Sequence, residues 1–165
     1  MPPSPIPVAP ADPTTALVRA RTTSLSTWQH TASDSFVPLA VHSDRPREFR
    51  ADLVGCVSDG VLFSTISASA HAVERGLEQI TRSTEPYVKL ALQLRGEGML
   101  VQDGREATLR PGDIAIYDTT RPYSLAFTDE LTTFCVMFPH RMIDVDDAAL
   151  RSLTAVRIAG EGGFA

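Results

Sequence analysis

Cysteine is scarce in this sequence, whose 165 residues include only Cys56 and Cys135. The two stand far apart in apolar, strand-like runs, a spacing that fits neither a disulfide framework nor a cysteine-based metal motif. We therefore expect two reduced, buried thiols. Long apolar runs are missing as well, since none approaches the roughly 20 residues that a membrane-spanning helix needs. The proline-rich start lacks the positive segment of a signal peptide, so we expect a cytoplasmic protein.

Basic residues are in the minority. The chain has 15 Lys and Arg against 20 Asp and Glu, which gives a net charge of −5. Phosphate contacts need a dense basic patch, so this balance argues against a nucleic-acid-binding surface within these residues. The length, with 43% hydrophobic and 21% charged residues, is typical of one globular domain with its own core.

Familiar catalytic and metal-binding patterns are also missing. The sequence contains no Gly-x-Ser-x-Gly elbow, P-loop or dinucleotide-binding fingerprint, so we predict no enzyme and no catalytic residues. A zinc or iron centre needs three or four converging ligands, and no His-x-His occurs, so we predict no metal or other cofactor. Scattered residues can converge in space, which keeps a metal site as a minor alternative. We expect surface or turn positions for the histidines, which are His30, His42, His71 and His140.

Proline and glycine divide the chain into three regions: a flexible Pro-rich arm (1–15), a main domain (16–142), and a helical segment with a Gly-rich linker (143–165). In the last region, Asp146 can cap a helix that carries Leu150 and Leu153 on one face. The linker ends abruptly, as a truncated chain or a natural terminus would.

The main domain is predicted to be all-β. A short helix over 16–21, which could continue through 22–28, is expected before the first strand. Turn signals then separate runs of β-forming residues every eight to twelve residues, the pattern of a sandwich or barrel. The expected strands are 36–41, 49–57, 61–73, 87–95, 99–102, 105–109, 114–117, 123–127 and 131–138, with a short helix over 76–81.

The strand over 87–95 shows the clearest alternation. Large apolar residues stand at the even positions from Val88 to Leu94, while Lys89, Ala91 and Gln93 occupy the other face. This period of two predicts a strand with one buried face. The alternation does not say which face looks inward.

A Pro-containing turn between two predicted strands, Tyr117 to Tyr123, collects several polar and aromatic side chains. A structural interpretation pairs Asp118 with Arg121 at a corner that Pro122 bends. A functional interpretation puts Arg121 or Tyr123 at the mouth of the barrel, where either could meet a polar ligand.

Three blocks occur in a fixed order along the chain: Gln102-Asp103-Gly104-Arg105, Pro111-Gly112-Asp113 and Arg121-Pro122-Tyr123. Together they resemble the cupin-like ligand-sensing domain of AraC-type transcription regulators, over roughly residues 25–160. The resemblance implies a double-stranded β-helix, or jelly-roll barrel, with a short N-terminal helix and a C-terminal helical segment. It also implies an effector-sensing domain that forms a homodimer. DNA would be bound only through a helix-turn-helix domain that this chain lacks.

The ligand pocket that the resemblance implies would bind a small molecule without metal. The aromatic candidates for its walls are Trp28, Tyr117 and Tyr123, and Gln93 and Arg121 are the candidates for polar anchors. Two alternatives stay open: a small stand-alone cupin enzyme (an isomerase or dioxygenase), which would hold stoichiometric metal, and a dimerisation module whose barrel is filled by side chains.

Overall fold

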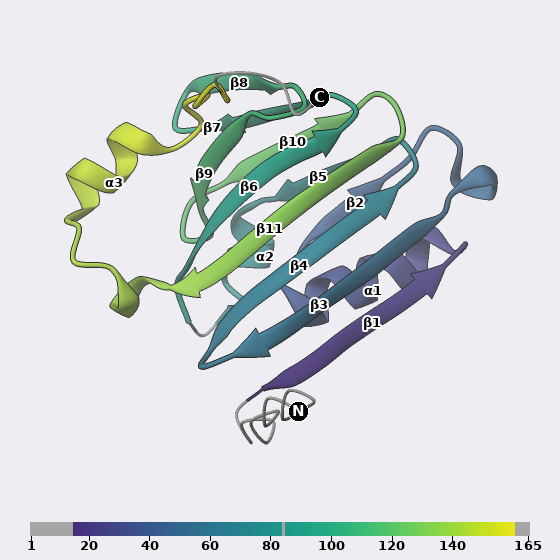
Figure 1. Ribbon diagram of the computed structural model, residues 1–165, viewed down its shortest axis with the longest axis horizontal. Coiled ribbons are helices and arrows are strands. Elements are labelled where there is room, and N and C mark those ends of the chain that lie inside the picture. The colour runs from purple at the N-terminus through teal and green to yellow at the C-terminus, as the bar shows by residue number, and fades with distance from the viewer. Residues whose placement is uncertain (1–14, 84, 161–165) are drawn as a thin grey trace, which may run out of the picture.

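Two antiparallel β-sheets face each other in the computed structural model, which describes residues 15–83 and 85–160 (Figure 1). The six-stranded sheet runs in the order β1 (Ala16–Thr22), β3 (Ala51–Ser58), β4 (Val61–Ala68), β11 (Leu131–Pro139), β6 (Tyr87–Arg95) and β9 (Ile114–Asp118). The five-stranded sheet runs in the order β2 (Ala40–His42), β5 (His71–Arg75), β10 (Tyr123–Phe127), β7 (Gly98–Gln102) and β8 (Arg105–Leu109). The helices are α1 (Leu25–Ser35), α2 (Leu77–Ile80) and α3 (Asp147–Leu153).

Most of the predicted strands are confirmed, because local turn chemistry sets their ends. Asp59 and Gly60 join β3 to β4 with φ of 51° and 80°, and Asp103 and Gly104 join β7 to β8 with φ of 52° and 73°. Positive φ at both central residues is the geometry of a type I′ turn, whose twist matches that of the flanking strands. The all-β prediction is therefore confirmed.

The predicted helix over 16–21 is wrong, since this segment forms strand β1. Its side chains alternate between half-buried and exposed, and it pairs with β3 along its whole length. The helix begins instead at Leu25. There the Ser24 hydroxyl accepts a hydrogen bond from the Thr27 amide at 3.2 Å, and Trp28 and Ala32 are buried one turn apart.

Two further predictions need correction. The strand expected over 61–73 divides at Ser69 into β4 and β5, which belong to different sheets. Ser69 still donates its amide to the Arg50 carbonyl at 2.9 Å, just beyond the last β3–β4 pair, and the chain crosses to the other sheet between Ser69 and His71. The strand expected over 36–41 is reduced to β2, and the residues before it form a loop that buries Phe36 in the core.

The C-terminal helix α3 starts where predicted. The Asp146 carboxylate accepts a hydrogen bond from the Ala149 amide at 2.7 Å. Leu150 is buried, but Leu153, expected on the same face, is 44% exposed. The chain then returns to the barrel, where Ile158 pairs with Ile114 of β9.

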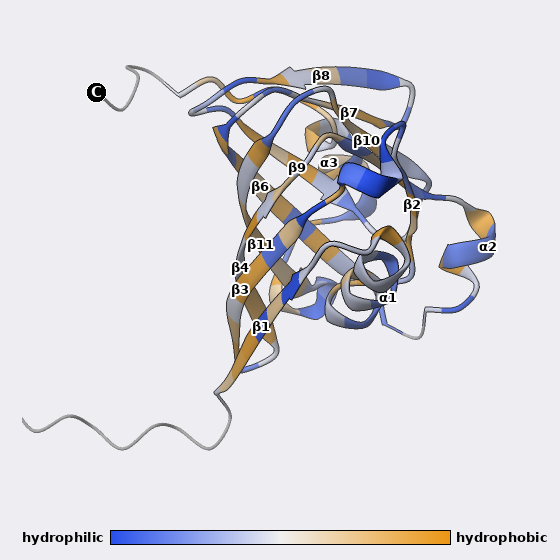
Figure 2. Cartoon of the chain, turned by 90° about the vertical axis from the view of Figure 1, so that its right-hand side faces the viewer, coloured by the Kyte–Doolittle hydropathy of each residue, from blue (hydrophilic) through white to orange (hydrophobic). Residues whose placement is uncertain are grey.

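Helix α1 closes one part of the barrel. Figures 1 and 2 place it on the side of the six-stranded sheet that faces the shorter sheet, where it contacts β1 and β2. Within the described ranges, no helix is long and apolar enough to cross a membrane. The predicted arm and linker fall largely on residues 1–14 and 161–165, outside the described residues.

Candidate functional site

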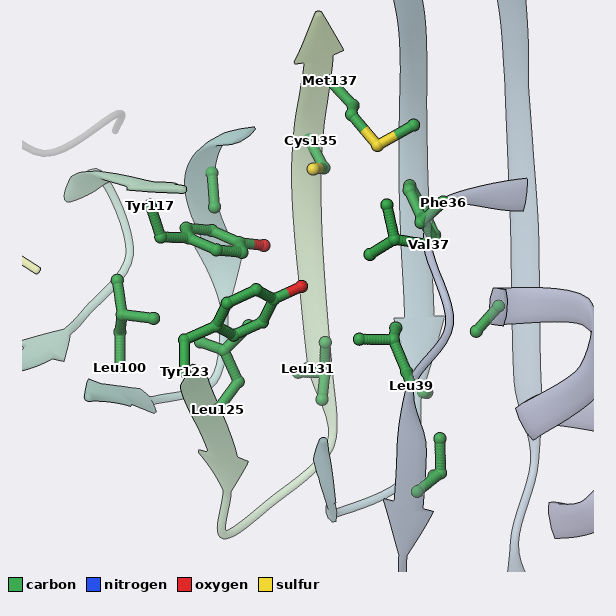
Figure 3. Close-up of a cluster of buried hydrophobic side chains, with 14 of the residues drawn as sticks. Phe36, Val37, Leu39, Leu100, Tyr117, Tyr123, Leu125, Leu131, Cys135 and Met137 are labelled. Carbon is green, nitrogen blue, oxygen red and sulfur yellow. The ribbon is translucent and has the colours of Figure 1, made fainter. Parts of the chain in front are cut away.

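A cavity of about 60 Å³ lies between the two sheets and α1. Its wall is mostly apolar and aromatic, and Figure 3 shows part of this cluster, with the rings of Tyr117 and Tyr123 side by side. Their centroids are 4.8 Å apart at an interplanar angle of 69°, an edge-on contact. Both hydroxyl groups point toward Cys135 and the segment that carries Phe36 (Figure 3). Burial raises the pKa of both phenols, so they are neutral hydrogen-bonding groups.

Four of the five predicted site residues line this cavity: Trp28 from α1, Gln93 from β6, Tyr117 from β9 and Tyr123 from β10. They come from both sheets and from the helix, so only the folded barrel brings them together. The fifth, Arg121, is not among the lining residues.

Arg121 lies instead in a corner of the barrel, as the structural interpretation of the 117–123 turn expects. Its guanidinium donates to both carboxylate oxygens of Asp103 at 2.8 and 3.0 Å, and to Asp118 at 3.0 Å. The hydrogen bonds from Arg121 lower the pKa of Asp103. Two acidic partners hold Arg121 in this corner, outside the wall of the cavity.

Gln93 lines the cavity, but its amide is bonded to the protein. The side-chain nitrogen donates to the Arg95 carbonyl at 2.9 Å and to the Gly96 carbonyl at 3.3 Å. The side-chain oxygen accepts from the Thr133 hydroxyl at 2.9 Å. Gln93 thus fastens β6 to β11 and to the bend after β6, and both of its donor hydrogens are used.

Sequence reasoning missed the most unusual group in the wall, Lys89. This residue is 4% exposed, and no carboxylate in the described part of the chain pairs with it. Its ammonium lies 4.5 Å from the Phe36 ring centroid, and 3.4 Å from the hydroxyl of Tyr123, to which it donates. Burial lowers the pKa of Lys89 to about 8. A signal was available, because Lys89 is the only lysine in the sequence and stands in the middle of an apolar strand.

A second buried cation lies close to Lys89. Arg75 is 1% exposed and donates to the Thr119 and Pro38 carbonyls and to the Ser83 hydroxyl, at 2.7 to 2.8 Å. These acceptors are neutral, so its charge is solvated but not cancelled. Its positive charge further lowers the pKa of Lys89, after the larger effect of burial.

Trp28 also has unused hydrogen-bonding capacity. Its indole Nε1 is buried and, within the described residues, meets no hydrogen-bond partner. A buried N–H without a partner costs free energy, so such groups in folded proteins call for an explanation. Here the indole stands in the wall of a cavity.

His71 is buried rather than at the surface or in a turn, which corrects that expectation. Burial lowers the pKa of its imidazole, and Nδ1 lies 2.8 Å from the Ser69 carbonyl. Nδ1 must carry the hydrogen to bond this oxygen, which leaves Nε2 as an acceptor. His71 and Phe127 line both the cavity and an outer recess beside β5 and β10, so they form the partition between the two.

Metal-ligand side chains do not gather in the described residues, where no group of three or more His, Cys, Asp and Glu could hold an ion. Cys135 is buried in the cavity wall and Cys56 is half-buried on the opposite face of the sheet, both as thiols. Burial raises the pKa of the Cys135 thiol, so it behaves as a small neutral group.

Comparison with known proteins gives three findings. Residues 28–164 match the model of the AraC-binding-like domain. An uncharacterised protein of the nit 5′ region in Bacillus sp. (strain OxB-1) is 34% identical over 119 residues, which cover 72% of this chain and 46% of that protein. The crystal structure of the AraC-like transcriptional activator CuxR superposes with a TM-score of 0.73 at 18% identity, covering 88% of this chain and 55% of that one.

The CuxR superposition confirms the predicted jelly-roll-like, cupin-like fold. The chain spans about half the length of both relatives.

Proposed function

Since the chain belongs to the family of AraC-binding-like domains, we propose that it is the effector-sensing domain of an AraC-type transcription regulator. The observation that carries this proposal is the cavity between the sheets. Within the described residues, the Lys89 ammonium in its wall has no carboxylate partner and the Trp28 indole N–H has no hydrogen-bond acceptor. A cavity with a few convergent polar groups in an apolar wall is the usual form of a small-molecule site.

The remaining features of the regulator are part of the same proposal. The domain forms a homodimer in the cytoplasm, has no catalytic role, and reaches promoter DNA through a helix-turn-helix domain elsewhere in the regulator. The charge of −5 supports a division of labour in which this domain makes no phosphate contacts.

The path from the cavity to the rest of the regulator runs along β9. Tyr117 contributes to the cavity wall, while its neighbour Ile116 accepts a hydrogen bond from the Ala155 amide at 3.0 Å. Ile114 and Ile158 exchange two hydrogen bonds of 2.9 Å further along the same strand. A ligand that favours one position of β9 thereby favours one position of the C-terminal segment, which is how differential affinity for two states becomes a signal.

Trp28 makes this proposal directly testable, because it is the only tryptophan in the sequence and lies in the cavity wall. A metabolite library is screened for compounds that change Trp28 fluorescence and raise the melting temperature of the purified chain. We expect such compounds, and we expect Ala91→Leu, which fills the cavity from β6, to abolish their binding.

The matched control is Leu94→Gln, on the outer face of the same strand, which should bind as the native chain does. Circular dichroism verifies that both variants are folded. Binding that survives in folded Ala91→Leu, or a library without any compound that affects Trp28, would reject the cavity as an effector site.

A further inference from the structure

We propose that the cavity is a carboxylate site, in which the ammonium of Lys89 pairs with the carboxylate of a small, otherwise apolar molecule. This inference rests on the proposed function of the cavity as the effector site, and it specifies the chemical class of the effector.

The first argument is charge. Lys89 and Arg75 place two cations in the interior, and no lining residue of the cavity in the described ranges is Asp or Glu. A buried cation without an anion is costly, and proteins usually offset it with a paired carboxylate. The nearby buried carboxylate, Asp118, is already bonded to Arg121 and to His140, each at 3.0 Å. The missing negative charge therefore falls to the ligand.

The second argument is the hydrogen-bonding character of the wall. Lys89 has three N–H donors and uses one on the Tyr123 oxygen, so two remain, and the Tyr123 O–H is left to donate in turn. The Trp28 N–H is a further donor, and residues 15–83 and 85–160 offer it no acceptor. These three groups donate, and an ionised carboxylate only accepts; the Nε2 of His71, also in the wall, is an acceptor.

The third argument is size and polarity. The cavity has a volume of about 60 Å³, so the ligand is small. Apart from its donors, the wall is apolar and aromatic, which suits a short aliphatic or aromatic body. A short monocarboxylate matches both the wall and the volume.

The experiment compares acids with neutral molecules of the same shape. The probes are propionate, butyrate, hexanoate and benzoate, each paired with its amide, titrated against the native chain while Trp28 fluorescence is followed. We expect at least one acid to bind at least tenfold more tightly than its amide. We expect Lys89→Met to remove that preference while keeping or improving the affinity for the amide.

Two measurements separate charge recognition from indirect effects. Arg82→Met removes an exposed cation just after α2 and should leave the affinity for the acid unchanged. This variant controls for the change in net charge. Lysine labelled with ¹³C at the ε-carbon yields a single ε-methylene signal, because Lys89 is the only lysine. That signal should shift on binding of the acid and not of the amide.

The outcomes divide cleanly between the two proposals. Equal affinity for acid and amide, or an acid that binds native and Lys89→Met alike, overturns the carboxylate site and leaves an effector site of another chemistry. A chain that binds none of the acids but binds neutral library compounds keeps the proposed function alone, and one that binds nothing loses both.

Discussion

The two faces of strand β6 invert the usual distribution of polarity. Lys89, Ala91 and Gln93 face the cavity, whereas the large apolar side chains of the strand, Leu90, Leu92 and Leu94, face outward. The outward row continues through hydrogen-bonded neighbours, from Leu90 to Val136 of β11 and Phe63 of β4. Figure 2 shows hydrophobic stretches along these strands. An ordinary half-buried strand turns its leucines to the core, so β6 departs from that pattern from Lys89 to Leu94.

The two buried cations, Arg75 and Lys89, differ in the groups that surround their charges. Arg75 has three oxygen acceptors around its guanidinium, whereas Lys89 has aromatic rings and one hydroxyl. Arg75 is therefore a structural cation whose donors are paired, whereas the Lys89 ammonium has two N–H donors left over. This difference predicts opposite effects on stability when each charge is removed.

The largest effect is expected for Arg75→Met. The substitution leaves the carbonyls of Thr119 and Pro38 and the hydroxyl of Ser83 without their donor. Hydrogen bonds from a charged donor contribute about 1.5–3 kcal/mol each. After allowance for the relieved burial of the charge, we expect a loss of about 4 kcal/mol in the free energy of unfolding. Urea denaturation followed by Trp28 fluorescence measures it.

Arg82→Met is the matched control for this prediction. Arg82 pairs with Glu78 at 2.6 Å on an exposed turn, and such surface pairs contribute about 0.5 kcal/mol. A similar loss in both variants would mean that burial of Arg75 has no special role, and the contrast between the two inner cations would fail.

Lys89→Met should act in the opposite direction and stabilise the ligand-free domain. Burial lowers the pKa of Lys89 in the folded state to about 8, from the ordinary lysine value of 10.5, so the folded state binds fewer protons than the unfolded state between these values. Stability therefore rises with pH across this window, and the full penalty of the charge applies below pH 8. At 1.36 kcal/mol per unit of pKa, that penalty is about 3 kcal/mol, which Lys89→Met removes.

Unfolding of both chains at pH 7 and pH 9 tests this linkage. The advantage of Lys89→Met should shrink by about 1 kcal/mol at pH 9, as the native lysine loses its proton. The neighbouring titratable groups are Tyr117, Tyr123, Cys135 and His71, which both chains share. A pH-independent difference, or a destabilised variant, would show that the ammonium has a partner that the fold does not reveal.

The sequence predicts the strands well because hairpin turns are local. Asp-Gly pairs at positive φ set the ends of β3, β4, β7 and β8 whatever the rest of the chain does. Strand β1 was mistaken for a helix because its only support is a distant partner: Ala16 faces Val57 across 41 positions of sequence. Pairing between residues so far apart in the sequence cannot be detected from the few residues on either side of β1.

The site was predictable only in part, and for a related reason. Aromatic side chains around a turn pointed correctly to Tyr117 and Tyr123 as wall residues, since large rings in strands are usually buried. Arg121 attracted attention for its charge, but charge does not tell which carboxylates lie nearby. The alternation along β6 does not predict that Lys89 lies in the cavity wall, because a period of two does not show which face of the strand is buried.

The smallest effects test which face of β6 is turned toward the cavity. Gln93→Leu should cost about 2 kcal/mol, because it leaves the Thr133 hydroxyl and two carbonyls without their partner. Leu94→Gln, one residue along the same strand, replaces a side chain that is 43% exposed and should change the free energy of unfolding by less than about 0.5 kcal/mol. Paired urea titrations compare the two. If the strand instead buried its leucines, Leu94→Gln would be costly and Gln93→Leu neutral. That result would contradict the assignment of Lys89 to the cavity wall.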